Sequence, residues 1–292
     1  MTVLVDKGTQ VLVQGITGTA AQHHTELMLS YGTNIVAGTR PGAGGKTVCG
    51  VPVYNSVEEA KTKHEINTAV LFVPARAMQN AAFEAMDAGI KLVVLVSEHV
   101  PLHDTMRIVE RAEQLEVIII GPNTPGIIAP SVPSNVGFMP SQYYIPGTIG
   151  VMSRSGTLTY EIVSRLTLAG IGQTTCVGVG GDAIVGTTFA TMLKKFEDDR
   201  NTKSILLIGE IGGSMEEEAA ELRIKGKITK PVVAYLAGRT APKDKKVGHA
   251  GAIVSAGRGS IKSKLEAFDR ADIPVAAYPD EVVDLISKTL EK

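Results

Sequence analysis

The chain has 292 residues, a length that favours two domains over a single core. Its formal net charge of −1 argues against electrostatic binding to nucleic acid or to a membrane surface. The two cysteines, Cys49 and Cys176, lie far apart and match neither a disulfide framework nor a zinc motif. We find no signal-peptide pattern and no apolar run of membrane-spanning length, so we expect a cytoplasmic protein with free thiols.

Short apolar runs alternate with helical patterns through the first half of the chain. The runs that predict strands are VLVQ, NIVAG, AVLFV, KLVVLV and EVIII. Between them, AQHHTELMLSYG and AMQNAAFEAMDAG repeat apolar residues at helical spacing and end in glycine. This alternation predicts an α/β fold with a parallel sheet and helices on both faces.

The middle of the chain, GPNTPGIIAPSVPSNVGFMPSQYYIPGT, has six prolines and no periodicity, which predicts a linker or an ordered crossing segment. The second half then repeats the strand–helix alternation with TIGVMS, TTCVGV, SILLIG, PVVAYLAG and IPVAAY, and predicts a second, flavodoxin-like sheet. Ser214 and Glu217 predict a capping box for the helix after SILLIG. Ligands bind beyond the carboxyl ends of such strands, so the residues after each run are the candidates for a site.

The turn after the first strand, GITGTA, has the residues of an anion site. Gly15 permits a tight turn, and Gly18 lets a backbone N–H approach an anion at the start of the following helix. An ordinary strand–helix turn is the alternative. The second strand ends in Thr39 and Arg40 rather than the acidic residue that would hold the ribose of NAD. A basic residue suits a nucleotide with an additional ribose phosphate, such as NADP or coenzyme A.

Two other motifs resemble a P-loop and a zinc site, but their surroundings do not support either function. The stretch RPGAGGKT ends like a Walker A motif, but Arg40 stands where the first glycine is required and a strand pattern follows, so we do not expect a P-loop. His99, His103 and Asp104 have zinc-like spacing, but Pro101 is predicted to begin the helix and would leave His99 outside it. We therefore expect no metal site.

The second half holds a candidate nucleophile. Ser153 and Ser155 in SRSGTLTYE precede a predicted helix and offer donors to an anion. Glu210 ends one strand, and His249 in KKVGHAGAI follows the next strand along the chain. Consecutive loops of a parallel sheet are usually close, so Glu210 could bind one imidazole nitrogen and leave the other free to attack phosphorus. Small neighbours of His249 would leave room for a phosphoryl group. A loop histidine with a structural hydrogen bond is the alternative.

The order of several motifs resembles that of a known family. GITG, PGAGGKT, GPNTPGII, SRSGTLTYE, GVGGD, IGEIGGS and APKDKKVGHAGAI occur as in the alpha subunit of succinyl-CoA synthetase (succinate–CoA ligase), over nearly the whole chain. The resemblance implies a nucleotide-dependent acid–CoA ligase of the tricarboxylic acid cycle, which forms succinyl-CoA reversibly through a phosphohistidine. It also implies a Rossmann-like CoA-binding domain (1–122), a connecting segment (123–146) and a flavodoxin-like ligase domain (147–292).

The resemblance further implies individual roles. His249 would be phosphorylated, Glu210 would orient it, Tyr160 would lie on the substrate side, and Ser153 and Ser155 would lie near the phosphate. The residues implied to bind coenzyme A are Thr17, Gly18, Thr19, Ala20, Val73, Pro74, Val96, Ser97, Glu98 and Asn123. ATP or GTP with Mg²⁺ is expected on a separate beta subunit in an αβ or α2β2 heteromer, with no nucleic-acid or membrane partner.

The chain departs from the family pattern in ways that keep alternatives open. Ala43 replaces a lysine associated with coenzyme A, for which Arg40 or Lys46 could substitute, and Thr124 replaces a cysteine. The segment IKGKITKPVV is similar to the sequences of citryl-CoA synthetase and ATP-citrate lyase, so citrate and malate are alternatives to succinate as the acid substrate. The alternative hypothesis of an NADP-linked oxidoreductase is supported by Arg40 alone. A non-catalytic CoA-binding module would not need the His249 loop.

Overall fold

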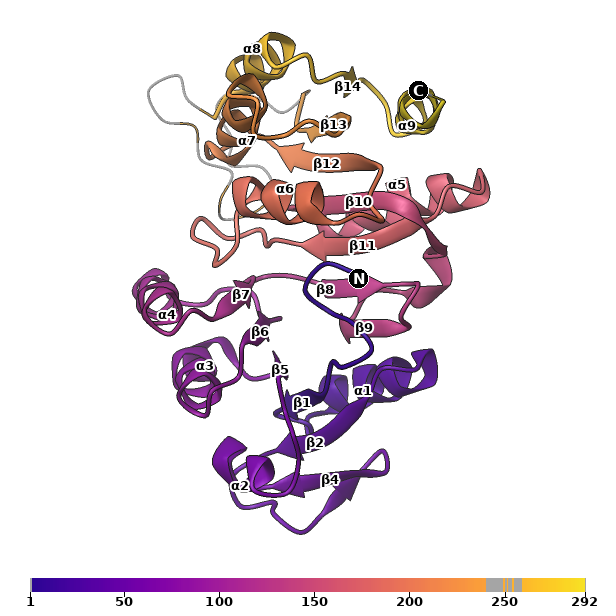
Figure 1. Ribbon diagram of the computed structural model, residues 1–292. Helices are drawn as coiled ribbons and strands as arrows, with labels where there is room; N and C mark the ends of the chain where they lie inside the picture. The colour runs from indigo at the N-terminus through magenta and orange to yellow at the C-terminus, as the bar shows by residue number, and fades with distance from the viewer. Residues whose placement is uncertain (1, 240–248, 250, 252–253, 255–258, 292) are drawn as a thin grey trace.

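The structure is a computed structural model that describes residues 2–239, 249, 251, 254 and 259–291, and it contains two seven-stranded sheets (Figure 1). The first sheet is parallel except for its edge strand β3, which pairs antiparallel with β4. In spatial order its strands are β3 (Thr47–Val48), β4 (Val51–Tyr54), β2 (Ile35–Thr39), β1 (Val11–Gln14), β5 (Thr68–Leu71), β6 (Leu92–Leu95) and β7 (Ile118–Ile120). With β3 set aside, this is the 3-2-1-4-5-6 order of a Rossmann fold.

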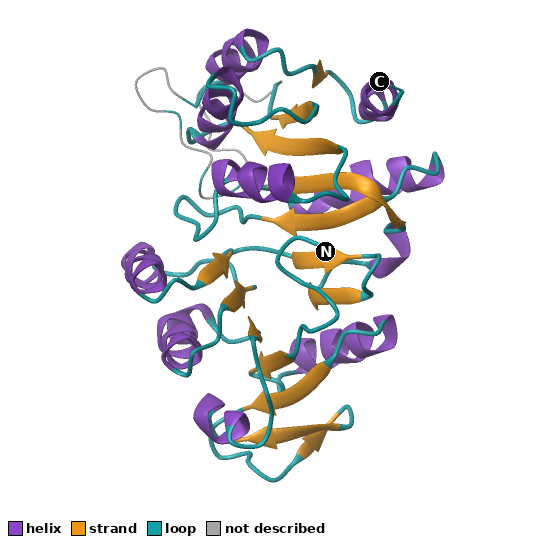
Figure 2. Ribbon diagram, in the orientation of Figure 1, coloured by secondary structure: helices purple, strands orange, loops and turns teal. Residues whose placement is uncertain are grey.

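Helices on both sides of the first sheet explain why its strands are almost wholly apolar (Figure 2). The helical elements of this half are α1 (Thr19–Tyr31), α2 (Val57–Lys61), the 3₁₀ turn η1 (Ala75–Ala77), α3 (Met78–Asp87) and α4 (Leu102–Gln114). All four residues of β1, β5 and β6 are buried. Helix α1 ends at Gly32, whose φ of 106° is a left-handed cap that glycine adopts without strain.

The second sheet has a parallel core of five strands and an antiparallel edge. In spatial order its strands are β14 (Val275–Ala276), β13 (Val232–Ala237), β12 (Ser204–Glu210), β10 (Pro146–Ser153), β11 (Gln173–Gly178), β8 (Gly126–Ala129) and β9 (Ser134–Gly137). Strands β10 to β14 follow the flavodoxin order 2-1-3-4-5. The helical elements here are η2 (Ser141–Tyr143), α5 (Gly156–Leu168), α6 (Phe189–Asp198), α7 (Met215–Ile224), α8 (Ile261–Arg270) and α9 (Glu281–Leu290).

The segment between the two predicted sheets contains β8 and β9, which the sequence analysis did not predict. They form an antiparallel pair, and β8 also pairs antiparallel with β11. Gly126 and Gly137 face each other in this pair with φ of 99° and 143°. A Cβ at Gly126 would lie 2.1 Å from the Val136 carbonyl oxygen, so only glycine fits. Both strands are only four residues long, lie between prolines and carry one of the paired glycines, so the sequence shows no alternating pattern there.

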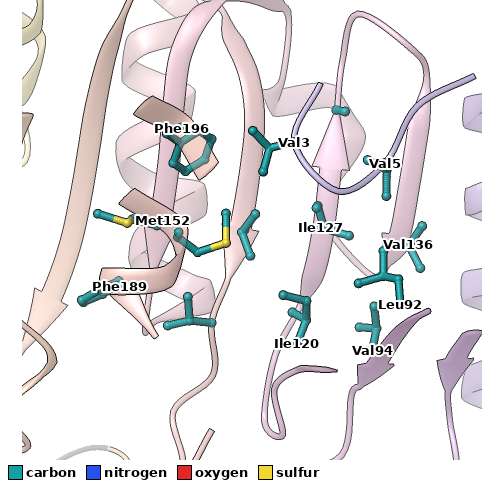
Figure 3. Packing of buried hydrophobic residues seen from close by; sticks show 14 of the residues in the cluster. Val3, Val5, Leu92, Val94, Ile120, Ile127, Val136, Met152, Phe189 and Phe196 are labelled. Carbon is teal, nitrogen blue, oxygen red and sulfur yellow. The ribbon is translucent and has the colours of Figure 1, made fainter. Parts of the chain in front are cut away.

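The N-terminal segment and β9 connect the two halves. Val3 and Val5 lie in one hydrophobic cluster with Val94 of the first sheet and with Ile127 and Met152 of the second (Figure 3). The Val3 N–H donates to Thr175 Oγ1 at 3.2 Å. Strand β9 packs along α1. The halves therefore share apolar surface. Among the helices of the described residues, none has both the length and the apolar character needed to cross a membrane.

Candidate active site

Glu210 and His249 meet at the carboxyl end of the second sheet. Glu210 is the last residue of β12 and is buried, whereas His249 is half-buried. Nδ1 of His249 lies 2.8 Å from Oε2 of Glu210, so the expected proximity of these two loops is confirmed. The hydrogen bond to Glu210 raises the pKa of His249 above its ordinary value, against the opposing effect of burial. With Nδ1 engaged, Nε2 is the ring nitrogen left for chemistry.

Arg154 holds the other oxygen of Glu210. Its side chain is 2% exposed, and Nη2 lies 3.2 Å from Glu210 Oε1. Nη1 donates to the Gly212 carbonyl oxygen at 2.7 Å, in the turn that follows β12. A buried carboxylate requires such a counter-charge. The sequence analysis missed Arg154, although it lies inside SRSGTLTYE between the two serines that were selected.

A second layer of charges lies behind this pair. Glu216 and Lys264 form an ion pair in which both side chains are fully buried. Burial raises the pKa of Glu216, and the positive charges of Lys264 and Arg154 oppose that rise. Near this layer the predicted capping box is wrong. Ser214 Oγ donates to Glu218 instead, and Glu217 binds Lys264 and Ser263 because the buried ammonium attracts its carboxylate.

Glycines let the backbone approach His249 and Arg154 closely. A Cβ at Gly181 would lie 2.6 Å from His249 Cγ, and a Cβ at Gly251 would lie 2.5 Å from Arg154 Nη2. The Gly251 N–H also donates to the Gly181 carbonyl oxygen at 3.1 Å. The space at Gly251 therefore accommodates Arg154, not the phosphoryl group that the sequence suggested. The other small neighbours expected to leave room, Gly248 and Ala250, lie outside the described residues.

Ser153, Ser155 and Tyr160 surround the start of α5. Ser153 is buried, and its Oγ donates to the Ser155 carbonyl oxygen at 2.9 Å and accepts from the Ser155 N–H at 3.1 Å. Ser155 is the N-cap of α5, and its Oγ accepts from the Leu158 N–H. Burial raises the pKa of Tyr160 to about 12. Within the described part of the chain, the buried Tyr160 hydroxyl has no hydrogen-bond partner.

A cavity of about 490 Å³ lies at the carboxyl end of the first sheet. Four of the residues expected to bind coenzyme A line it: Thr17, Gly18, Val73 and Pro74. Arg40 also lines it and donates from Nη1 to Thr17 Oγ1 at 2.6 Å, whereas the exposed Lys46 is not in the lining. Thr19 and Ala20 begin α1 beside the cavity, outside its lining.

The remaining expected coenzyme A residues run from this cavity towards His249. Val96, Ser97 and Glu98 follow β6, and Ser97 Oγ donates to the Val73 carbonyl oxygen at 2.6 Å. The Asn123 N–H donates to the Ser97 carbonyl oxygen at 3.0 Å, and Asn123 Nδ2 donates to Asp182 Oδ1 at 3.1 Å. Asp182 follows Gly181, which packs against the imidazole. A line of hydrogen bonds thus joins the cavity to the His249 loop.

Asp182 is a further residue that sequence reasoning missed, although the motif GVGGD contains it. It is buried, and burial raises the pKa of its carboxyl group. The hydrogen bond from Asn123 opposes that rise, and His249 and His99 are near enough to oppose it electrostatically. The site therefore has acidic side chains on two loops around one histidine.

The two sequence motifs set aside earlier have other structural roles. The N–H groups of Gly42 and Gly44 both donate to Asn55 Oδ1 at 3.1 Å, and the β3–β4 hairpin follows where a P-loop would begin a helix. His99 is exposed and precedes α4. Among the described residues, no group of three or more His, Cys, Asp or Glu side chains could hold a metal ion.

Comparison with known proteins gives two family matches and close relatives. The model described as "CoA binding domain" matches residues 6–99, and the one described as "CoA-ligase" matches residues 152–273. The ADP-forming succinate–CoA ligase alpha subunit 2 of Archaeoglobus fulgidus is 50% identical over 290 residues, which is 99% of this chain and 100% of that protein. The corresponding alpha subunit of Methanothermobacter thermautotrophicus is 49% identical, covering 99% of this chain and 97% of that protein.

A solved structure has a similar fold in a longer chain. ATP citrate lyase from Methanothrix soehngenii, in complex with citrate and coenzyme A, superposes with a TM-score of 0.88 at 25% sequence identity. The match covers 99% of this chain and 50% of that one, so this chain spans half the length of that enzyme.

Proposed function

Given that the chain belongs to the alpha-subunit family of ADP-forming succinate–CoA ligases, we propose that His249 carries the phosphoryl group in its reaction. One observation supports this above the others: Glu210 binds Nδ1 of His249 at 2.8 Å, while Arg154 holds the second oxygen of the same carboxylate. The arrangement fixes the imidazole in one tautomer, with the proton on Nδ1 and the lone pair on Nε2.

The chemistry follows from that tautomer. Nε2 attacks the terminal phosphorus of a nucleoside triphosphate, the P–N bond forms and the bond to the nucleoside diphosphate breaks. The ring becomes positively charged, and the Glu210 carboxylate stabilises that charge through Nδ1–H. A carboxylate oxygen of succinate then takes the phosphoryl group. The sulfur of coenzyme A then attacks the acyl carbon, the C–O bond to phosphate breaks, and the thiol proton passes to the departing phosphate, so that succinyl-CoA and phosphate are formed.

Coenzyme A is assigned to the first half of the chain. The N-terminus of α1, at Thr17–Ala20, offers N–H groups to its phosphates, and Arg40 supplies a positive charge in the same cavity. Gln14 also lines this cavity, and within the described chain its buried Oε1 has no hydrogen-bond partner, which suits a ligand N–H. The thiol arm would run past Val96–Glu98 and Asn123 towards His249.

The acid is assigned to the second half. Among the residues that the structure describes, the buried Tyr160 hydroxyl has no hydrogen-bond partner, a costly arrangement that a bound carboxylate would relieve. Ser153 and Ser155 lie at the start of α5, where the N–H groups and the helix dipole favour a phosphoryl group. In this arrangement the two hydroxyls order the turn, and the backbone supplies the donors.

We place ATP or GTP, with Mg²⁺, on a beta subunit in an αβ or α2β2 heteromer. The relatives are named as alpha subunits, which implies a beta subunit beside each of them. In the described part of this chain the P-loop-like segment is a turn whose Gly42 and Gly44 N–H groups already donate to Asn55 Oδ1. Triphosphate chemistry needs a phosphate cradle and metal carboxylates, and those are expected from the partner.

The test is to incubate the chain with γ-labelled ATP or GTP and Mg²⁺, with and without the beta subunit. We expect acid-labile label on His249 only when the partner is present, and none in His249→Ala. The exposed His103 on α4 provides the matched control, since His103→Ala should be labelled like wild type. Equal labelling without the partner would contradict the heteromer. Thioester formation is then compared for succinate, citrate and malate, and a preference for either of the latter two would contradict succinate as substrate.

A further inference from the structure

A buried lysine on α8 lies one layer behind the candidate active site. The side chain of Lys264 is 0% exposed. Its ammonium group has three N–H donors, and three acceptors surround it: the Gly213 carbonyl oxygen at 2.9 Å, Glu217 Oε2 at 3.0 Å and Glu216 Oε2. Each donor of this buried charge therefore has a partner at the start of α7.

Glu216 extends the effect of Lys264 towards the active site. Its Oε2 binds Lys264, and its Oε1 accepts the backbone N–H of Glu210 at 3.0 Å. The same Oε1 lies 3.8 Å from Arg154 Nη1. A Cβ at Gly209 would lie 2.6 Å from this oxygen, so the glycine is what admits the carboxylate. One buried carboxylate thus joins α8 to the end of β12.

The two supports converge on Glu210. Arg154 donates to the Gly212 carbonyl oxygen at 2.7 Å, in the turn that Lys264 also binds, and faces Glu210 Oε1 at 3.2 Å. The backbone N–H of Glu210 is therefore hydrogen-bonded from behind, and its Oε1 is paired with Arg154 by charge, without a hydrogen bond among the described residues. Only Oε2 is left, and it binds His249.

We propose that Lys264 and Glu216 are positioning residues for the phosphorylation of His249, because they hold Glu210 in the orientation that binds Nδ1. The inference rests on the proposed role of His249. A buried ion pair adds little stability over apolar side chains of the same size, so stability alone does not explain these charges. Without Lys264, the buried Glu216 would take up a proton. The neutral acid would then attract Arg154 less and hold the Glu210 N–H less firmly.

The first test replaces the ammonium by an apolar side chain of similar length. In the complex with the beta subunit, Lys264→Met should slow phosphorylation of His249 by roughly 10–100-fold, the loss expected for a charged hydrogen bond, with KM for coenzyme A unchanged. Lys262 gives the matched control on the same helix. It is 86% exposed and pairs with Glu266 at 3.8 Å, so Lys262→Met should stay within about twofold of wild type.

A second measurement distinguishes a change in the position of Glu210 from a direct electrostatic effect of Lys264 on His249. The pKa of His249 is followed by NMR of the full chain with labelled histidine, assigned by comparison with His249→Ala. Among the described residues, the charged groups that act on His249 are Glu210, Arg154 and Asp182. If Lys264→Met releases Glu210 from Nδ1, the His249 pKa falls towards 6.5, its ordinary value. If Glu210 instead stays in place, the His249 pKa should stay unchanged when Glu216 takes up a proton, or rise when Glu216 keeps its charge.

If Lys264→Met does not fold, the double variant Lys264→Met/Glu216→Leu still tests the positioning role. It replaces the ion pair by apolar side chains, so it should fold, yet it removes the acceptor for the Glu210 N–H. We expect slow phosphorylation and a lowered His249 pKa. A folded variant with wild-type rate and an unchanged or raised pKa would overturn the inference, as would a loss of thermal stability alone. Absence of phosphorylation in wild type would instead overturn the proposed function, and the pKa measurement would still decide the positioning role.

Discussion

Replacement of Glu210 by glutamine tests how the carboxylate acts on His249. Glu210→Gln keeps the size of the side chain and removes its charge. The amide can still accept a hydrogen bond, but in the proposed reaction it would no longer stabilise the positive imidazole that forms when Nε2 attacks phosphorus. The bond at stake is the one of 2.8 Å between Nδ1 and Oε2.

The expected loss follows from the burial of the pair. The Glu210 side chain is 9% exposed, so water screens the interaction little. A hydrogen bond to a charged group contributes about 1.5–3 kcal/mol, and about 1.4 kcal/mol corresponds to a tenfold rate, so phosphorylation should slow roughly 10–100-fold. Arg154 loses one charged partner but keeps Gly212 and Glu216. We therefore expect lower thermal stability and a folded protein.

The pH dependence of the phosphorylation rate is the decisive test of this role of Glu210. Glu210 raises the pKa of His249, so the protonated, unreactive form persists to higher pH in wild type than it would without this contact. Glu210→Gln should move the acid limb of the phosphorylation rate to lower pH while lowering its plateau. The ratio of wild-type to variant rate should therefore be smaller near pH 6 than near pH 8. Glu266→Gln, on the exposed face of α8, is the matched control. An unchanged acid limb, or an equal ratio at both pH values, would refute the reasoning.

Further predictions concern single contacts. Arg40→Ala should weaken coenzyme A binding by roughly 10–100-fold by calorimetry, and 3′-dephospho-coenzyme A binding less, whereas Lys46→Ala outside the cavity should change neither. Gly181→Ala should abolish His249 labelling with coenzyme A binding intact, because its Cβ would lie 2.6 Å from the ring; retained labelling would contradict the packing. His249→Ala should lose the stability that protonation adds, which is full below about pH 6.5 and disappears as pH rises through the raised pKa; denaturant unfolding at pH 5.5 and 8 measures it. Tyr160→Phe should raise KM for succinate more than KM for coenzyme A, and the reverse would remove Tyr160 from the acid site.

The sequence predicts the parallel strands well because helices cover both faces of each sheet. Buried strands then read as continuous apolar runs, as VLVQ and SILLIGE do, and glycines mark the turns beyond them. It fails at β8 and β9, where prolines and the paired glycines at 126 and 137 remove both the apolar run and the alternation. In those strands the backbones at Gly126 and Gly137 approach so closely that a Cβ on either residue would collide with the facing strand. The amino-acid composition of the segment does not reveal this contact.

The candidate site divides in the same way. Proximity of Glu210 and His249 could be predicted because each follows a strand, and adjacent strands bring their loops together. Their catalytic roles, and those of the coenzyme A residues, remain predictions. The charges behind them could not be predicted. Glu216 stands in a run of three glutamates that reads as an exposed helix face, and its partner Lys264 lies on the next helix, 48 positions away.

The line of hydrogen bonds between the two sheets explains why the recognisable motifs are spread along the whole chain. Ser97 and Asn123 follow strands of the first sheet, Asp182 follows a strand of the second, and each binds the next. Both sheets therefore direct their carboxyl ends towards one place, which is where open α/β sheets bind ligands. A ligand with phosphates at α1 and a reactive end near His249 must contact loops from both sheets. The proposed placement of coenzyme A would therefore need both halves, and the shared apolar cluster around Val3 and Val94 packs those halves against each other.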